Sequence, residues 1–158
     1  MTAGSTAGDL FARHQRDVHR YLARMTGSRD AADDLTQEVF LRVVRGLRNG
    51  GPIGHERGWV FAIAHNLVAD AHRQRGRTLA LSDRPEEPAG DASQALAAGL
   101  AQALGRLPDA DREIFLLKET GGLSYEEIAN TCGCTVESVR ARLYRTRATL
   151  RGLLAIRF

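Results

Sequence analysis

Aromatic residues and cysteines are scarce in this chain of 158 residues. Aromatics make up 6% of the sequence, and segments that alternate β-branched and polar residues are absent. Because such alternation is the signature of half-buried strands, its absence argues against a β-sheet protein. Alanine and leucine are abundant, and both favour helix. The composition therefore predicts a protein that is nearly all α.

The two cysteines, Cys132 and Cys134, are separated by a single residue. That spacing is too short for the disulfide framework that is typical of small secreted proteins. No apolar run approaches the ~18 residues that a membrane span requires. Residues 1–8 lack the apolar core of a signal peptide. We therefore expect a soluble cytoplasmic protein with no membrane contact of its own.

Sequence patterns of catalysis and metal binding are also missing. There is no glycine-rich phosphate loop and no nucleophile elbow. The five histidines share no ligand spacing, and no histidine near the cysteine pair in the sequence is available to complete a zinc site. We expect Cys132 to be a small buried residue at a turn. The sequence thus predicts no enzyme activity, no catalytic residues, no metal and no cofactor.

Charge is distributed unevenly, although its net value is only +3. Residues 1–78 carry a formal net charge of +4, residues 79–97 carry −3 and residues 98–158 carry +2. The middle segment is rich in proline and acidic residues, which predicts a flexible linker. Fully extended, it would span up to roughly 60 Å, so the two flanking domains need not touch. We expect a disordered tail over residues 1–8 and helical domains over residues 9–78 and 98–158.

The segment from Gly122 to Leu150 predicts a helix-turn-helix. Ser124 followed by Glu127 forms a capping box. Gly133 is the expected left-handed end of the first helix, and Thr135 is placed to cap the second.

The second helix of this motif has two distinct faces at 100° per residue. Its apolar stripe consists of Val136, Val139, Leu143, Thr146 and Leu150. The opposite face carries Ala141, Tyr144 and Arg145, with Arg140 at its border. Arginine, tyrosine and a small residue suit a helix that lies in a DNA major groove. An amphipathic helix with solvated arginines is the alternative.

Three helices are predicted in the N-terminal half. The first begins near Asp9, the second spans residues 29–47 and the third is opened by Trp59. The second helix is acidic in its first half and basic in its second half, an order that complements the helix dipole. Its polar surface is either solvated or available to a partner, and consists of Asp33, Asp34, Gln37, Glu38 and Arg42.

The third helix ends in a basic cluster formed by Arg73, Arg75 and Arg77. Cations at this position suit the helix dipole. Together with Asn66 and an exposed Trp59, they also suit a nucleic-acid backbone and unstacked bases.

Two further helices are predicted before the helix-turn-helix. One runs from about Ser93 to Pro108 with leucines on one face. The next is capped by Asp109 and ends at Gly121 and Gly122.

Together these segments resemble the extracytoplasmic-function (ECF) sigma factors, the small two-domain members of the bacterial sigma family. Residues 30–40 (DAADDLTQEVF) resemble the helix that binds core RNA polymerase. Residues 59–66 (WVFAIAHN) resemble the helix at the promoter minus-ten element. Residues 107–129 resemble the start of the fourth conserved region, and residues 139–147 (VRARLYRTR) resemble the minus-thirty-five recognition helix.

The resemblance implies a transcription initiation factor with three sets of contacts. Contacts to the clamp of the polymerase β′ subunit would be made by Asp33, Asp34, Gln37, Glu38 and Arg42. Contacts to the minus-ten element would be made by Trp59, Asn66, Arg73, Arg75 and Arg77, with Asn66 holding a flipped base. Contacts to the minus-thirty-five element would be made by Arg140, Ala141, Tyr144, Arg145 and Arg147. The β flap of polymerase and an anti-sigma factor are further implied partners.

Two other functions remain compatible with the residues. One is a dimeric helix-turn-helix regulator that binds a palindrome without polymerase. The other is a helical adaptor whose arginines have no role in DNA binding.

Overall fold

A computed structural model describes residues 5–52, 55–75 and 92–157, and it has helices but no strand within these ranges. The N-terminal group of helices is α1 (Ala7–Thr26), α2 (Arg29–Arg48) and α3 (Glu56–Arg75). The C-terminal group is α4 (Ala92–Gly105), α5 (Asp109–Glu119), α6 (Tyr125–Cys132) and α7 (Val136–Arg157). The all-α prediction is confirmed. In the part of the chain described, no helix is both long and apolar enough for a bilayer.

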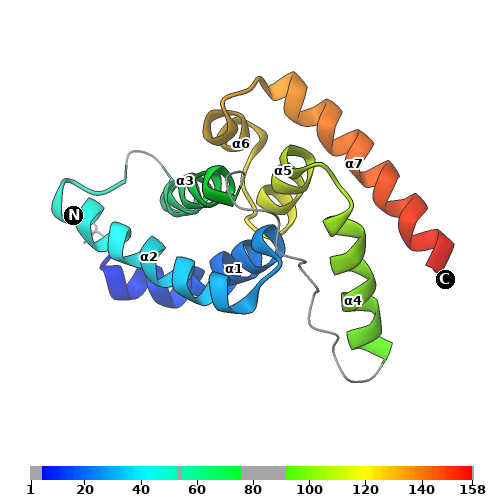
Figure 1. The fold of residues 1–158 in the computed structure, drawn as a ribbon. Coiled ribbons are helices and arrows are strands. Elements are labelled where there is room, and N and C mark those ends of the chain that lie inside the picture. Colours follow the sequence, from blue (N-terminus) through cyan, green and yellow to red (C-terminus); the bar gives the residue numbers. More distant parts are fainter. Residues whose placement is uncertain (1–4, 53–54, 76–91, 158) are drawn as a thin grey trace.

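Helices α1 and α2 lie side by side, and α3 packs across both (Figure 1). The connection between α1 and α2 is tight because Gly27 adopts a left-handed conformation, with φ at 70°, and Ser28 then caps α2 by accepting a bond from Ala31 N. The core of this group is largely apolar and consists of Leu10, Val18, Tyr21, Leu22, Met25, Ala32, Val39, Phe40, Val43, Val60, Phe61, Ala64, Leu67 and Val68.

Helix α1 begins two residues before the predicted start at Asp9. Thr6 caps it through a full capping box, in which the Thr6 hydroxyl accepts from Asp9 N and the Asp9 carboxylate accepts from Thr6 N. Ser5 is also held, because its hydroxyl donates to Glu56 Oε1 at 2.7 Å. The predicted disordered tail over residues 1–8 therefore extends too far, and residues 1–4 lie outside the described residues.

Helix α3 begins at Glu56, three residues before the predicted start at Trp59. An acidic residue in the first turn suits the positive end of the helix dipole, and Glu56 is fixed there by Ser5 and by Arg13 at 3.1 Å. Trp59 is partly buried, since its indole lies directly against Gly46 of α2. The prediction that Trp59 is exposed is wrong, because the absence of a side chain at Gly46 lets the ring pack inward.

In the C-terminal group, α4 packs against α7, and α5 and α6 also pack against α7 (Figure 1). Helix α4 begins at Ala92, so the last six residues of the predicted linker over residues 79–97 are helical. Helix α5 is preceded by Pro108, and Asp109 is its first residue rather than its cap. Residues 79–91, the rest of the linker prediction, fall outside the described ranges, as do residues 76–78 at the end of the predicted N-terminal domain.

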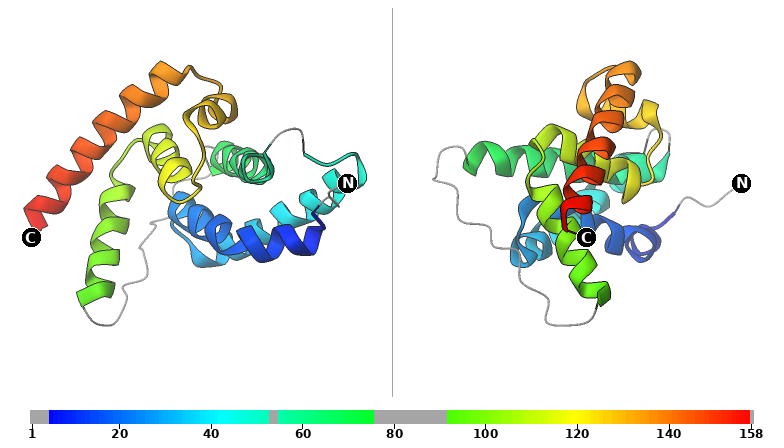
Figure 2. Two further views of the ribbon diagram at one scale, coloured as in Figure 1. Left: turned by 180° about the vertical axis from the view of Figure 1, so that it is seen from behind. Right: turned by 90° about the vertical axis from the view of Figure 1, so that its right-hand side faces the viewer.

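The two groups of helices pack against each other, through contacts of α1 with α5 and of α3 with α6 (Figure 2). The length of the predicted linker left the two groups free to lie apart, so this contact was not predicted. The buried apolar residues of both groups form one continuous cluster, and polar side chains from both groups also pair across the interface.

Candidate polymerase and nucleic-acid interfaces

The helix-turn-helix has the geometry that its sequence predicts. The Ser124 hydroxyl accepts from Glu127 N at 3.1 Å, and the Glu127 carboxylate accepts from Ser124 N at 3.0 Å. Gly133 is left-handed, with φ at 69°, and its N–H donates to Ala129 O. Thr135 then accepts from Ser138 N at 3.1 Å at the start of α7. These local bonds fix the angle at which α7 leaves the turn.

Helix α7 presents the two faces expected from its periodicity. The predicted stripe packs on the core, with Val139, Leu143, Thr146 and Leu150 buried and Val136 partly buried. On the opposite face, Tyr144 is 74% exposed, and Arg140, Ala141 and Arg145 are exposed as well. This outward face offers guanidinium, phenol and a small side chain to a binding partner.

Two side chains of α7 are oriented by neighbouring helices. The Arg140 guanidinium lies 5.6 Å from the centre of the Tyr125 ring, a cation–π distance that limits its motion. Arg147 donates to Glu119 Oε1 at 2.8 Å. Arg147 is therefore partly engaged within the protein, whereas Arg145 is exposed.

The predicted polymerase-binding residues lie together on the outer surface of α2. Asp33, Asp34 and Gln37 are exposed. Arg42 lies 3.3 Å from Glu38 in an i,i+4 ion pair with both side chains more than one-third exposed, and Asp33 contacts His19 of α1 at 2.6 Å. On the same helix Leu41 is 52% exposed, and Phe11 of α1, whose ring contacts Phe40 of α2, is 45% exposed. The surface thus combines acidic groups with apolar area that a partner could cover.

The predicted minus-ten residues are only partly brought together. Asn66 is exposed midway along α3, and Arg73 is exposed in its last turn, where it pairs with Asp70. Arg75 ends the helix, and Arg77 lies outside the described residues. Trp59 faces Gly46, as described above. Asn66 and Arg73 are therefore the members of the set that the structure leaves accessible.

Arg57 of α3 is the main polar link between the two groups of helices. Its guanidinium donates to Asp17 Oδ2 of α1 at 2.6 Å and to the main-chain oxygen of Thr120 at 3.1 Å, and it also donates to the oxygen of Gly121. His14 lies 3.1 Å away, and burial together with the charge on Arg57 lowers the pKa of His14 below its usual value. The half-buried Arg57 thus satisfies acceptors in both groups. This link could not be predicted from residue types, because the acceptors at residues 120 and 121 are backbone atoms.

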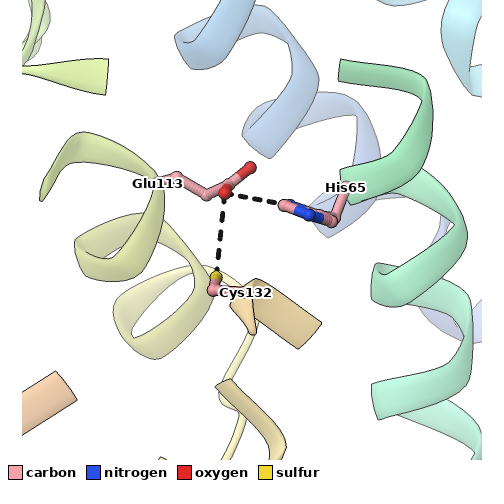
Figure 3. A group of neighbouring side chains, drawn as sticks. All are labelled: His65, Glu113 and Cys132. Carbon is pink, nitrogen blue, oxygen red and sulfur yellow. Dashed lines mark hydrogen bonds and ion pairs between the residues drawn. The ribbon is translucent and has the colours of Figure 1, made fainter. Parts of the chain in front are cut away.

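A second link joins α3 to α5 and α6 through His65, Glu113 and Cys132 (Figure 3). His65 Nδ1 lies 2.9 Å from Glu113 Oε1, and Cys132 Sγ lies 3.7 Å from the same oxygen. The buried Tyr21 of α1 donates to Glu113 Oε2 at 2.7 Å. Contact with the Glu113 carboxylate raises the pKa of His65 against the effect of burial, and burial raises that of Cys132 to about 12.

This cluster corrects one sequence-based expectation. No histidine near the cysteine pair was expected, since His65 is distant from Cys132 along the chain. Packing of the two helical groups nevertheless places His65 and Glu113 beside Cys132, whereas Cys134 is not part of the cluster.

The chain is similar to bacterial sigma factors in sequence and fold. The family model described as Sigma-70 region 2 matches residues 10–78, and Sigma-70, region 4 matches residues 98–150. The ECF RNA polymerase sigma factor SigE of Mycolicibacterium smegmatis is 39% identical over 93% of this chain, which spans only 61% of that protein's length. The ECF RNA polymerase sigma factor EcfG of Rhodopseudomonas palustris is 31% identical over 88% of this chain and 80% of its own length.

A solved structure has a similar fold. CnrH, in complex with the cytosolic domain of CnrY, matches with a TM-score of 0.73 and 27% identity, over 95% of this chain and 88% of its own. The matched regions contain both the acidic surface of α2 and the outward face of α7. The chain therefore belongs to the ECF RNA polymerase sigma factors.

Proposed function

We propose that this chain is a transcription initiation factor that binds core RNA polymerase and directs it to specific promoters. One observation carries the proposal furthest: a helix-turn-helix whose second helix buries its apolar stripe and exposes Arg140, Ala141, Tyr144 and Arg145. Such a face contacts base edges and phosphates once the helix lies in a major groove. In the sigma family this groove is that of the minus-thirty-five element.

The accessible residues of α3 are proposed to act at the minus-ten element. Asn66 offers an amide that pairs with the edge of an extruded base, and Arg73 offers a guanidinium to the backbone. Capturing a base offsets the cost of unpairing it, which is on the order of a few kcal/mol. Arg75 and Arg77 follow on the chain and would extend the basic path.

The acidic surface of α2 is proposed to bind the clamp of the β′ subunit. Asp33, Asp34 and Gln37 present acceptors to basic partners, and the exposed Leu41 gives the apolar area that a stable interface needs. The C-terminal group would contact the β flap. Polymerase would then hold both DNA-binding faces on one promoter, so that the second contact becomes intramolecular and two weak sites bind tightly.

The packing of the two helical groups supports regulation by a protein partner. CnrH has the same fold and is in complex with the cytosolic domain of CnrY. We propose that an anti-sigma factor stabilises the packed arrangement of this chain, which hides the surfaces of α3 and α5 that face each other. A partner of RNA polymerase acts in the cytoplasm, and we propose that location for this chain.

The test is to mix the purified chain with bacterial core polymerase that lacks any sigma factor. Co-elution, together with defined transcript starts from a pool of genomic fragments, is the expected result. Binding to a symmetric DNA site without polymerase, with no initiation, would instead identify a dimeric helix-turn-helix regulator. Absence of any DNA preference would identify a helical adaptor.

A further inference from the structure

The cluster of His65, Glu113 and Cys132 has no role in the proposed contacts with polymerase or DNA. Its members come from three helices: His65 from α3, Glu113 from α5 and Cys132 from the end of α6 (Figure 3). One potential ligand atom from each residue lies within 4.8 Å of the others. Each side chain is partly buried, so the cluster is neither open surface nor closed core.

We propose that these three residues bind a divalent transition-metal ion of the zinc class at the junction between the two helical groups. An imidazole nitrogen, a carboxylate oxygen and a cysteine sulfur are the ligands that Zn²⁺ prefers. In a tetrahedral zinc site, bond lengths place neighbouring ligand atoms about 3.3–3.7 Å apart. The corresponding distances from Glu113 Oε1 are 2.9 Å to His65 and 3.7 Å to Cys132. Small side-chain rotations therefore suffice to admit the ion.

The surroundings of the cluster support this assignment. His65 Nδ1 is close to the carboxylate but outside the angles of a hydrogen bond, so this buried nitrogen has no well-oriented partner. Tyr21 donates to the other oxygen of Glu113 at 2.7 Å and fixes the carboxylate. Such outer contacts orient metal ligands and strengthen binding. Mg²⁺ and Ca²⁺ prefer oxygen ligands alone, and a thiol disfavours both.

Charge balance favours a doubly charged ion. Cys132 binds as a thiolate, so each ion that enters displaces the thiol proton to solvent. One thiolate, one carboxylate and a neutral imidazole then compensate the two charges of the ion. The fourth position of a tetrahedral site is left for water. No oxidation or reduction takes place.

Metal binding would connect the two helical groups, since His65 belongs to one and the other two ligands belong to the other. The bound ion would hold α3 against α5 and α6. If the chain acts as the sigma factor proposed above, polymerase must hold the two helical groups apart on one promoter. The bound ion would then oppose assembly with polymerase, because it holds the groups together. This consequence rests on the proposed function, whereas metal binding itself does not.

The experiment uses the full chain freed of metal, titrated with Zn²⁺ against a chromogenic chelator and separately with Co²⁺. We expect one ion per chain and a thiolate-to-cobalt absorption band. Cys132→Ser should abolish the band and weaken Zn²⁺ binding by more than about 100-fold, a loss above that of an outer contact. Cys134→Ser, two residues away and outside the cluster, is the matched control and should retain both. Tyr21→Phe should weaken binding by about tenfold.

A second pair of variants keeps both thiols. His65→Gln should weaken Zn²⁺ binding like Cys132→Ser, whereas His72→Gln on the same helix should not, because His72 contacts Asp109 and not the cluster. Circular dichroism of the metal-free variants establishes that each one folds. Absence of stoichiometric binding, or equal losses in the two cysteine variants, would overturn the proposal. Zinc binding by a chain that does not initiate transcription would overturn only the proposed function.

Discussion

The guanidinium of Arg57, on α3, donates a hydrogen bond to the main-chain oxygen of Thr120 at 3.1 Å, and so ties the N-terminal helices to the end of α5. Arg57→Met keeps the aliphatic stem but removes every donor. Each hydrogen bond from a charged group contributes roughly 1.5–3 kcal/mol. We therefore expect the free energy of unfolding to fall by at least about that amount. The radius of gyration from small-angle X-ray scattering should rise as the two groups separate.

Arg13→Met is the control for that change. Arg13 pairs with Glu56 inside the N-terminal group, and its side chain is 54% exposed. Loss of the Arg13–Glu56 ion pair should leave the radius of gyration unchanged. Equal dimensions for the Arg57 variant and the natural chain would mean that other contacts hold the groups together.

His14 should make stability fall in mild acid. Burial, followed by the charges of Arg57 and Arg13, lowers the pKa of His14, although Glu56 and Asp17 oppose this. The neutral ring is therefore favoured in the folded state. Its contribution is fully present above the unfolded pKa of about 6.5 and is lost as pH falls through that value towards the folded pKa.

Urea unfolding at pH 7.5 and pH 5.5 measures this effect. The natural chain should lose more stability between these conditions than His14→Gln does. The histidine with a raised pKa, His65, is present in both proteins, so its contribution cancels in the comparison. An identical pH dependence would rule out His14 as the source.

Gly46→Ala should destabilise the protein although alanine favours helix. A methyl group at this position would overlap the indole of Trp59. Overpacking typically costs about 1–3 kcal/mol, against a helix gain of about 0.5–1 kcal/mol. Gly152 in α7 has open space around its Cα. Gly152→Ala should therefore stabilise the protein by the helix preference of alanine alone. Denaturant midpoints of the two variants should therefore move in opposite directions.

Arg140→Ala and Arg145→Ala should each weaken recognition of the minus-thirty-five element by roughly 1–3 kcal/mol. Arg151→Ala removes another exposed arginine from α7, beyond the residues that match region 4, and serves as the control. Promoter binding by the reconstituted holoenzyme is the measurement. Losses of the same size at all three positions would indicate a nonspecific charge effect.

Asp34→Arg should weaken binding to core polymerase, because it places a cation in the acidic surface of α2. Asp30→Arg makes the same change of charge on the same helix, outside the predicted contact set, and should have a smaller effect. Competition for core polymerase against a second sigma factor gives the relative affinities. Equal affinities for the two variants would count against this surface as the β′ contact.

Local sequence signals account for most of the secondary structure. The ends of α6 were predictable because Ser124, Glu127 and Gly133 act within a few residues of one another. The buried and exposed faces of α7 were predictable from its periodicity, because that pattern is also set by residues a few positions apart. The start of α3 was missed because Glu56 is held by Ser5 and Arg13, which belong to another part of the chain.

Contacts between the two helical groups could not be predicted from local patterns. Arg57 binds backbone oxygens at residues 120 and 121, and a backbone acceptor leaves no mark in a sequence. His65, Glu113 and Cys132 come from three helices with no shared spacing. Only the packing of those helices brings the three side chains together.

The contact between α3 and α6 also limits how much promoter the chain can bridge. Residues 66 and 145 lie on helices about 30 Å long that are joined through this contact. Two promoter elements centred about 25 base pairs apart are separated by roughly 85 Å along B-form DNA, at about 3.4 Å per base pair. In the packed arrangement the outward face of α7 is nevertheless open. If residues 66 and 145 contact the two elements as proposed, the packed chain is too short to contact both at once, and the two helical groups must separate before it can.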